Sequence, residues 1–200
     1  MNTFVKICGI ATPDALDAAV QAGADAVGFV FHDGSPRDIE PHRAAALAAR
    51  LPACVKSVCV TLHPDVDRIA RILDAFVPDA WQSDAGDFGA LELPASIERW
   101  PVFRHAGAAV ALPRRAVFDA PASGRGMRGD WQGAAALARR CELILAGGLE
   151  PSNVAEAIAA VGPFGVDISS GVERAPGVKD AALIRAFVAA ARGAPLRRMA

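Results

Sequence analysis

Short apolar runs alternate with helix-like segments along almost the whole of this 200-residue chain. The first run, residues 4–10, is apolar and β-branched, and the Thr-Pro-Asp sequence that follows is typical of a helix start. The later runs repeat this pattern with short links. Near-continuous apolar strands separated by helices predict a parallel sheet that is buried on both faces.

The number of strands selects the fold. Expected strands lie at residues 4–10, 26–31, 56–60, 79–82, 101–104, 116–119, 142–146 and 164–168. Expected helices lie at residues 12–21, 41–51, 64–76, 131–139, from 151 onward, and 179–192, with only weakly periodic helical pieces within 83–116. A doubly wound sheet rarely needs eight units, and no G-x-G-x-x-G motif follows a strand. We therefore predict an α/β fold, a single (β/α)8 TIM barrel over residues 1–200 with shortened helices in the middle and a loose tail at 194–200.

Composition and charge argue against several classes of partner. A formal net charge of −1 gives no electrostatic reason to expect nucleic acid or an anionic membrane surface. No apolar stretch approaches the length needed to span a bilayer, and the amino terminus lacks the pattern of a secretory signal. We expect a cytoplasmic protein, and a monomer because the pattern suggests no large exposed apolar face.

The four cysteines neither form a C-x-x-C pair nor cluster with the four histidines, so a metal site or a disulfide framework is not predicted. Cys54, Cys59 and Cys141 lie in or beside apolar runs and are expected to be packing residues. Cys8 differs because it stands near the end of the first strand, where a barrel places catalytic groups. The alternative is that Cys8 is a small buried hydrophobe.

The ends of other strands carry groups that complement this thiol. Asp119 ends the sixth strand, so the two groups face one barrel mouth and can divide the work of acid and base. Asp119 can equally be a turn or helix-capping residue. Lys6 lies on the same strand face as Cys8, where it either favours the thiolate or is an interior charge that needs a partner.

Small residues follow the last two strands. Gly147 and Gly148 come after the seventh, and Ser169, Ser170 and Gly171 after the eighth. Backbone N–H groups of such residues can approach an anion closely, and barrels often bind phosphate with these two loops. The alternative is that the small residues only make tight turns. Their position at both strands predicts a phosphate site and hence a phosphorylated small-molecule substrate.

Five segments occur in order from about residue 4 to 180: VKICGI, AGADAVGFVF with a following SPR, FDA with a Gly-rich loop and DW, LAGGLEPSNV, and GVDISSGVE. Together they resemble the phosphoribosylanthranilate isomerase family. The resemblance implies an Amadori rearrangement in tryptophan biosynthesis, an aldose–ketose isomerisation that converts N-(5-phosphoribosyl)anthranilate into 1-(2-carboxyphenylamino)-1-deoxyribulose 5-phosphate. It implies neither a metal nor an organic cofactor.

The resemblance also implies residue roles. Asp119 takes the place of the acid that opens the furanose ring, and Cys8 that of the base that removes the C2′ proton. Arg37 of the SPR segment is placed to hold the anthranilate carboxylate, although it can also be a solvated loop residue. Asp167 is expected to line the substrate pocket.

Two segments depart from the family pattern. Gln82-Ser83-Asp84-Ala85 stands where the family usually has Gln-Leu-His-Gly, and Ser123-Gly124-Arg125-Gly126 stands where it usually has Gly-Gly-Thr-Gly. The second loop also gains Arg128. These departures leave two alternatives: a paralogous isomerase of another phosphorylated sugar derivative, or a non-catalytic barrel that binds a phosphorylated ligand. Retention of Cys8 and Asp119 argues against the latter.

Overall fold

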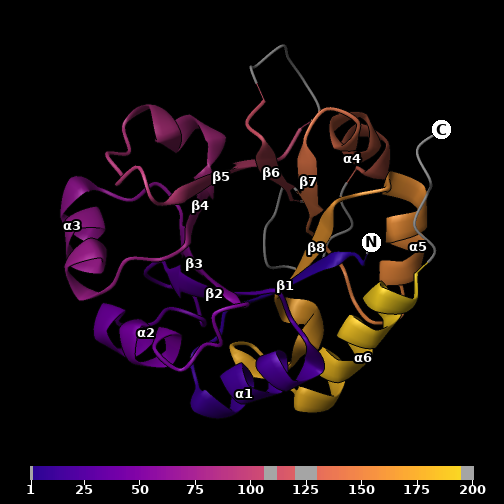
Figure 1. Cartoon of the computed structure of the whole chain (residues 1–200), viewed down its shortest axis with the longest axis horizontal. Helices are drawn as coiled ribbons and strands as arrows, with labels where there is room; N and C mark the ends of the chain where they lie inside the picture. Colours follow the sequence, from indigo (N-terminus) through magenta and orange to yellow (C-terminus); the bar gives the residue numbers. More distant parts are fainter. Residues whose placement is uncertain (1, 106–111, 120–129, 195–200) are drawn as a thin grey trace.

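Eight parallel strands close into a barrel in the order β1 to β8, and β8 pairs with β1 (Figure 1). The computed structural model describes residues 2–105, 112–119 and 130–194. The barrel strands are β1 (Phe4–Cys8), β2 (Ala26–Phe31), β3 (Lys56–Thr61), β4 (Ala80–Asp84), β5 (Glu98–Phe103), β6 (Arg115–Phe118), β7 (Glu142–Leu145) and β8 (Gly165–Ile168). The predicted TIM barrel is therefore confirmed.

Helices surround the strands as an outer ring (Figure 1). They are α1 (Pro13–Ala22), α2 (Pro41–Ala48), α3 (Val66–Ala75), α4 (Trp131–Ala138), α5 (Val154–Val161) and α6 (Ala181–Gly193). After β4 the chain forms only a short 3-10 helix, η1 (Ala85–Gly89), and after β8 the 3-10 turn η2 (Ser170–Val172) precedes a small antiparallel pair, β9 (Glu173–Ala175) and β10 (Val178–Lys179). No helix among these described residues is long and apolar enough to cross a membrane.

Local sequence signals explain several boundaries. The Thr12 hydroxyl accepts a hydrogen bond from the Ala15 N–H at the start of α1, Pro13 is the first residue of this helix, and Gly23 ends it with a φ of 86°. Side chains of aspartates cap three other helices in the same way, namely α3, α4 and α6. The closing helix begins at Ala181 and not at Lys179, because Asp180 caps it and Lys179 belongs to β10.

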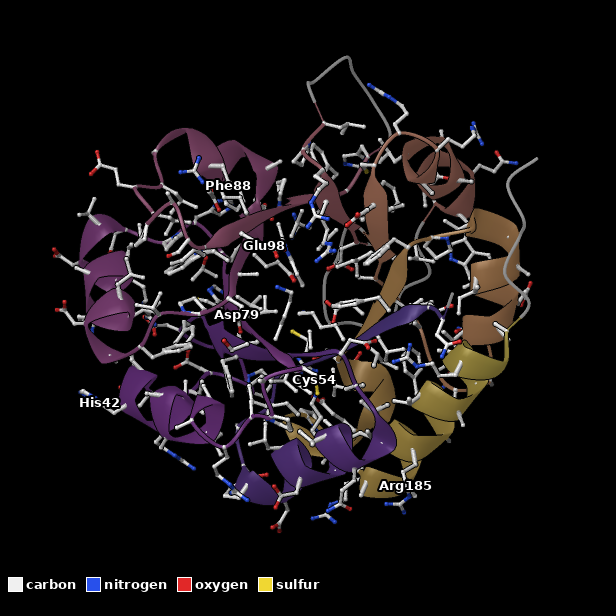
Figure 2. The ribbon with its side chains drawn as sticks, in the orientation of Figure 1. His42, Cys54, Asp79, Phe88, Glu98 and Arg185 are labelled. Atoms are coloured by element: carbon white, nitrogen blue, oxygen red, sulfur yellow. The ribbon has the colours of Figure 1, made fainter. Side chains whose placement is uncertain are left out.

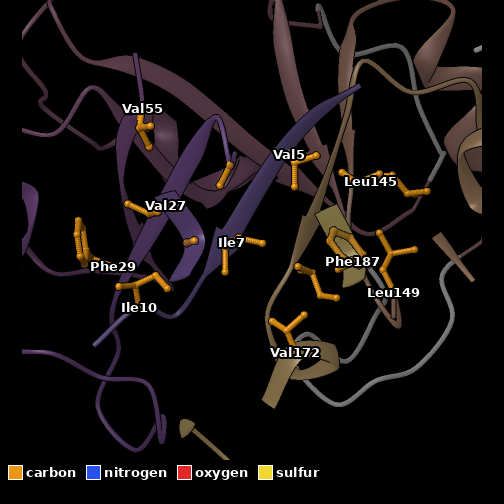
Figure 3. Close-up of a cluster of buried hydrophobic side chains, with 14 of the residues drawn as sticks. Val5, Ile7, Ile10, Val27, Phe29, Val55, Leu145, Leu149, Val172 and Phe187 are labelled. Atoms are coloured by element: carbon orange, nitrogen blue, oxygen red, sulfur yellow. The ribbon is translucent and has the colours of Figure 1, made fainter. Parts of the chain in front are cut away.

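Strand alternation separates two apolar layers. Val5 and Ile7 of β1 face the helices and pack in the main core with residues such as Phe29 and Phe187 (Figure 3). The opposite side chains of β1, Lys6 and Cys8, point into the barrel. This alternation gives the barrel lumen its polar groups while the outer layer stays apolar.

The amino ends of the strands carry a buried cationic cluster that the sequence pattern did not predict. Arg115, the first residue of β6, is 8% exposed and lies 4.6 Å from the Phe164 ring centroid and 5.3 Å from that of Trp100. It also donates hydrogen bonds to Glu142 and Glu98. Figure 2 shows Glu98 at these strands, whereas the labelled side chains of α2 and α6 lie on the outer surface.

Three sequence expectations need correction. β5 begins at Glu98, three residues before the expected start, because the charge of Glu98 is paired with Lys56 and Arg115 at the strand ends. Cys54 is exposed, so it is not a packing residue. Ala194, the first residue of the expected tail, is 8% exposed and packs in the core, and residues 195–200 lie outside the described part.

Candidate active site

A cavity of about 650 Å³ opens at the carboxyl ends of the strands, and residues from all eight strands or their following loops line it. This volume is in the range of small-molecule sites. Eight of the nine predicted site residues line it: Cys8, Arg37, Asp119, Gly147, Gly148, Asp167, Ser169 and Ser170. The topology therefore brings together groups that are up to 162 positions apart in the chain.

Cys8 lies at the end of β1 and is 7% exposed. Burial raises the pKa of its thiol, and the ammonium groups of Lys6 and Lys179 act in the opposite direction. Asp119 follows β6, and its backbone N–H donates to the Phe103 carbonyl at 3.0 Å. Thiol and carboxyl therefore reach the same cavity from strands separated by β7 and β8.

Asp167 is buried and paired with a lysine from the neighbouring strand. Lys6 Nζ donates to Asp167 Oδ2 at 2.8 Å, and the Lys6 side chain is fully buried. Burial raises the pKa of Asp167, and the Lys6 charge opposes this rise. Asp167 Oδ1 has no hydrogen-bond partner among the described residues although it is buried. A buried carboxylate oxygen beside the cavity is therefore able to accept a hydrogen bond from a ligand.

Arg37 is held by an acidic residue, Glu173, that the sequence pattern did not indicate. Its Nε and Nη2 atoms donate to Glu173 Oε1 and Oε2 at 2.7 and 2.8 Å. Lys179 Nζ donates to Glu173 Oε1 at 2.7 Å and to the Ser169 carbonyl at 3.0 Å. These contacts hold the pKa of Glu173 below its usual range even though burial acts to raise it. The Arg37 side chain is thus held in place by Glu173 and lines the cavity, so Arg37 is not a solvated loop residue.

The turns after β7 and β8 meet closely. Gly147 and Gly148 have φ values of 84° and 64°, a conformation that favours glycine. Gly171 is not among the cavity-lining residues. A Cβ atom at this position would lie 2.1 Å from the Leu149 carbonyl oxygen, so Gly171 lets the two turns pack together. Its expected contact with phosphate remains a prediction, as do the other expected phosphate contacts.

The comparisons with known proteins agree with this geometry. The model of the family described as N-(5'phosphoribosyl)anthranilate (PRA) isomerase matches residues 5–190. The chain belongs to this isomerase family. The N-(5'-phosphoribosyl)anthranilate isomerase of Bordetella pertussis is 41% identical and covers 95% of this chain and 96% of its own length.

Solved structures of the family have the same fold. Phosphoribosyl anthranilate isomerase from Thermus thermophilus is 31% identical, with a TM-score of 0.81 over 94% of this chain and 98% of its own. A phosphoribosyl anthranilate isomerase in complex with reduced 1-(o-carboxyphenylamino)-1-deoxyribulose 5-phosphate is also 31% identical. Its TM-score is 0.74 over 96% of this chain and 99% of its own.

One of the two departures from the isomerase family pattern faces the cavity. Asp84, the last residue of β4, lines it and accepts a hydrogen bond at 2.5 Å from Nη1 of Arg104, the residue after β5. His63, from the loop after β3, has its Nε2 atom 3.7 Å from Asp84 Oδ2 and its Nδ1 atom 2.8 Å from Asp87 Oδ1. An imidazole therefore lies beside Asp84, although it belongs to the loop after β3 and not to the segment after β4 where the family pattern has its histidine.

The second departure, Ser123-Gly124-Arg125-Gly126 with Arg128, lies outside the described residues.

Within the described ranges, no group of three His, Cys, Asp or Glu residues is placed to hold a metal ion. The sequence pattern did not indicate Arg104, Glu173 or Lys179, because their roles depend on contacts between distant strands. Only the GVDISSGVE segment carried a signal for Glu173.

Proposed function

We propose that this protein converts N-(5-phosphoribosyl)anthranilate into 1-(2-carboxyphenylamino)-1-deoxyribulose 5-phosphate, a step of tryptophan biosynthesis. The observation that carries the proposal is the placement of a thiol, Cys8, and a carboxyl, Asp119, in one cavity beside the glycine and serine turns after β7 and β8. The relative that was solved with the reduced product supports the same substrate class.

Asp119 acts first, as the general acid. It donates a proton to the furanose ring oxygen, and the bond between this oxygen and C1′ breaks. The lone pair of the anilino nitrogen forms a double bond to C1′, which gives a cationic Schiff base. General acid catalysis of this kind typically contributes about 10²–10⁴-fold to a rate.

Cys8 acts second, as the general base. Its thiolate takes the C2′ proton, which the adjacent iminium has made acidic, and the C–H electron pair forms the C1′–C2′ double bond of a neutral enolamine. Protonation at C1′ and loss of the 2′-hydroxyl proton then give the ketone. Neither step requires a metal or an organic cofactor.

The remaining predicted residues bind the substrate. The phosphate lies against Gly147, Gly148, Ser169, Ser170 and Gly171. Asp167 accepts a hydrogen bond from the sugar or the anilino group through its Oδ1 atom. Because Glu173 occupies the Nε and Nη2 atoms of Arg37, the anthranilate carboxylate meets the guanidinium from its Nη1 side.

The organisation of the protein completes the proposal. We propose a single barrel domain over residues 1–200 that works as a monomer in the cytoplasm on a small phosphorylated substrate, without nucleic-acid or membrane partners. Four cysteines that are all free in the structure support a reducing compartment.

The test is a direct assay that follows the loss of fluorescence of phosphoribosylanthranilate. Turnover by the wild type should fall at least about 100-fold in Cys8→Ala and in Asp119→Asn. Cys54→Ala and Asp17→Asn are matched controls, because Cys54 is an exposed thiol and Asp17 an exposed carboxylate on α1, both away from the cavity. An inactive wild type that binds ribose phosphates would overturn the proposal and favour the paralogue or the non-catalytic barrel.

A further inference from the structure

A fully buried lysine that the mechanism above does not use lies beside the base. Lys6 and Cys8 occupy alternate positions of β1, so both side chains point into the barrel lumen. Lys6 is 0% exposed, and a charged group is buried this completely only when it is paired. Its Nζ atom donates to Asp167 Oδ2 at 2.8 Å. Lys6 is therefore a paired interior charge, as one of the two interpretations of the sequence predicted.

Lys6 also reaches the sulfur. The Lys6 charge acts on the Cys8 thiol as well as on Asp167, and it lowers the pKa of the thiol. Gly28, the residue that pairs with Cys8 on β2, leaves the space for this contact. A Cβ atom at position 28 would lie 2.9 Å from Cys8 Sγ and 3.2 Å from both Lys6 Cε and Lys6 Nζ. The Lys6 ammonium and the Cys8 sulfur therefore lie close together beside Gly28, which has no side chain.

Charged groups from several elements surround the sulfur. Lys6 lies on its own strand, Asp167 on β8 and Lys179 on β10. The charge of Asp119, which follows β6, raises the pKa of Asp167, and the Arg37 side chain after β2 lies close to Gly9. Among the groups that favour the thiolate, Lys6 has the largest effect, and burial works against it.

We propose that Lys6 is a positioning residue that stabilises the thiolate of Cys8, and that Gly28 provides the space in which the ammonium and the sulfur meet. In this scheme the thiol proton leaves to water, the Lys6 ammonium balances the sulfur charge, and the thiolate then accepts the C2′ proton. The inference rests on the proposed function, because that function assigns Cys8 as the base.

Variants of Lys6 and of Asp167 should shift the pKa of the Cys8 thiol in opposite directions. Its carboxylate competes with the sulfur for the same ammonium. Removal of the Lys6 charge should raise the pKa of Cys8 and so disfavour the thiolate. Removal of the Asp167 charge should lower this pKa. A purely structural role of the ion pair predicts the same direction in both variants.

The measurement is a pH titration of the thiolate absorbance near 240 nm. The chain contains no tyrosine, so tyrosinate does not obscure this band at high pH. Each variant is compared with the same variant carrying Cys8→Ser, and the difference isolates one sulfur. Because an opposite charge within about 4–6 Å shifts a pKa by roughly 1–3 units, Lys6→Met should raise the Cys8 midpoint by about one unit or more. Asp167→Asn should lower it.

Lys6→Met leaves a buried carboxylate without its cation and can fail to fold. The double variant K6M/D167N removes both charges, and comparison with D167N alone then reports the effect of Lys6. We expect the double variant to lose the downward shift of D167N. Equal midpoints in D167N and K6M/D167N, or shifts of K6M and D167N in one direction, would overturn the proposal.

Gly28→Ala supplies the catalytic readout. It should lower kcat about tenfold or more with a smaller change in KM, because it separates the base from its counter-charge while the substrate contacts stay. Gly193→Ala is the matched control, since a Cβ atom there meets nothing within 4 Å. A G28A enzyme with unchanged kcat would contradict the role of this space. The titration needs no substrate, so it tests Lys6 even if the isomerase activity itself is absent.

Discussion

Replacement of Arg115 by methionine should destabilise the barrel strongly although the residue lies far from the cavity. The guanidinium lies over the rings of Phe4, Trp100 and Phe164, with its carbon 5.4, 5.3 and 4.6 Å from their centroids. Desolvated cation–π contacts contribute about 1–2 kcal/mol each, and charge-assisted hydrogen bonds such as those to Glu142 contribute about 1.5–3 kcal/mol. Methionine keeps part of the packing, so we expect a net loss of about 3 kcal/mol.

Arg114 is a matched control on the adjacent position. It pairs with the same Glu142 carboxylate, but its side chain is 64% exposed, whereas that of Arg115 is 8% exposed. An exposed pair contributes about 0–1 kcal/mol, so Arg114→Met should cost less than about 1 kcal/mol. Urea unfolding measures both variants. In thermal unfolding, the Arg115 variant should lose about 6–12 °C, since 1 kcal/mol corresponds to roughly 2–4 °C at this size.

The pH dependence gives a second check on the same cluster. Burial acts to raise the pKa of Glu98, but hydrogen bonds from Lys56 and Trp100, together with the charges of Lys56 and Arg115, hold this pKa below its usual range. A depressed carboxyl pKa stabilises the protein above the unfolded pKa and loses this effect as the pH falls through the folded value. The difference between the wild type and Arg115→Met should therefore shrink in acid. Equal losses for Met at positions 114 and 115 would refute the reasoning, because burial and ring contacts would then have no effect.

The remaining predictions concern the cavity. Because burial raises the pKa of the Cys8 thiol and the base must be deprotonated, kcat should rise with pH above neutrality; a kcat that falls from pH 7 to 9 would contradict this role. Gly171→Ala should raise KM about tenfold, since its Cβ atom would meet a carbonyl of the β7 turn at 2.1 Å, whereas Gly193→Ala should leave KM unchanged in the same assay. His63 should titrate above 6.5 by NMR because its hydrogen bond to Asp87 raises its pKa, and Asp87→Asn should lower the midpoint; an unchanged midpoint would exclude this pairing.

The positions of the proposed acid and the proposed base were predictable from the sequence. Cys8 and Asp119 stand at or directly after strand ends, and the alternation of strands with helices is enough to place both at one barrel mouth. Most strand boundaries follow from the same apolar pattern. β5 was the exception, because Glu98 and Arg99 interrupt its apolar run at the end where neighbouring strands supply opposite charges.

The partners of the site residues were not predictable, since they come from distant parts of the chain. Lys6 meets Asp167 across 161 positions, and Arg37 meets Glu173 across 136. Periodicity shows which side of a strand a residue occupies, but not which charge lies opposite on the next strand. For the same reason the sequence left two interpretations of Lys6 open. The role of Gly171 as a close-packing residue depends equally on a contact between two turns.

The closure of β8 on β1 has a consequence for the order in which the site is made. The proposed base stands at residue 8, but the strand that completes its surroundings ends at Ile168, and Lys179 follows later still. A nascent chain that has emerged only as far as β7 holds Cys8 on a strand with one free edge, without Asp167 beside it. Contacts of such high sequence separation form late and slowly. The proposed acid–base site is therefore assembled only when synthesis is nearly complete, and shorter translation products carry Cys8 and Lys6 without Asp167 and Lys179.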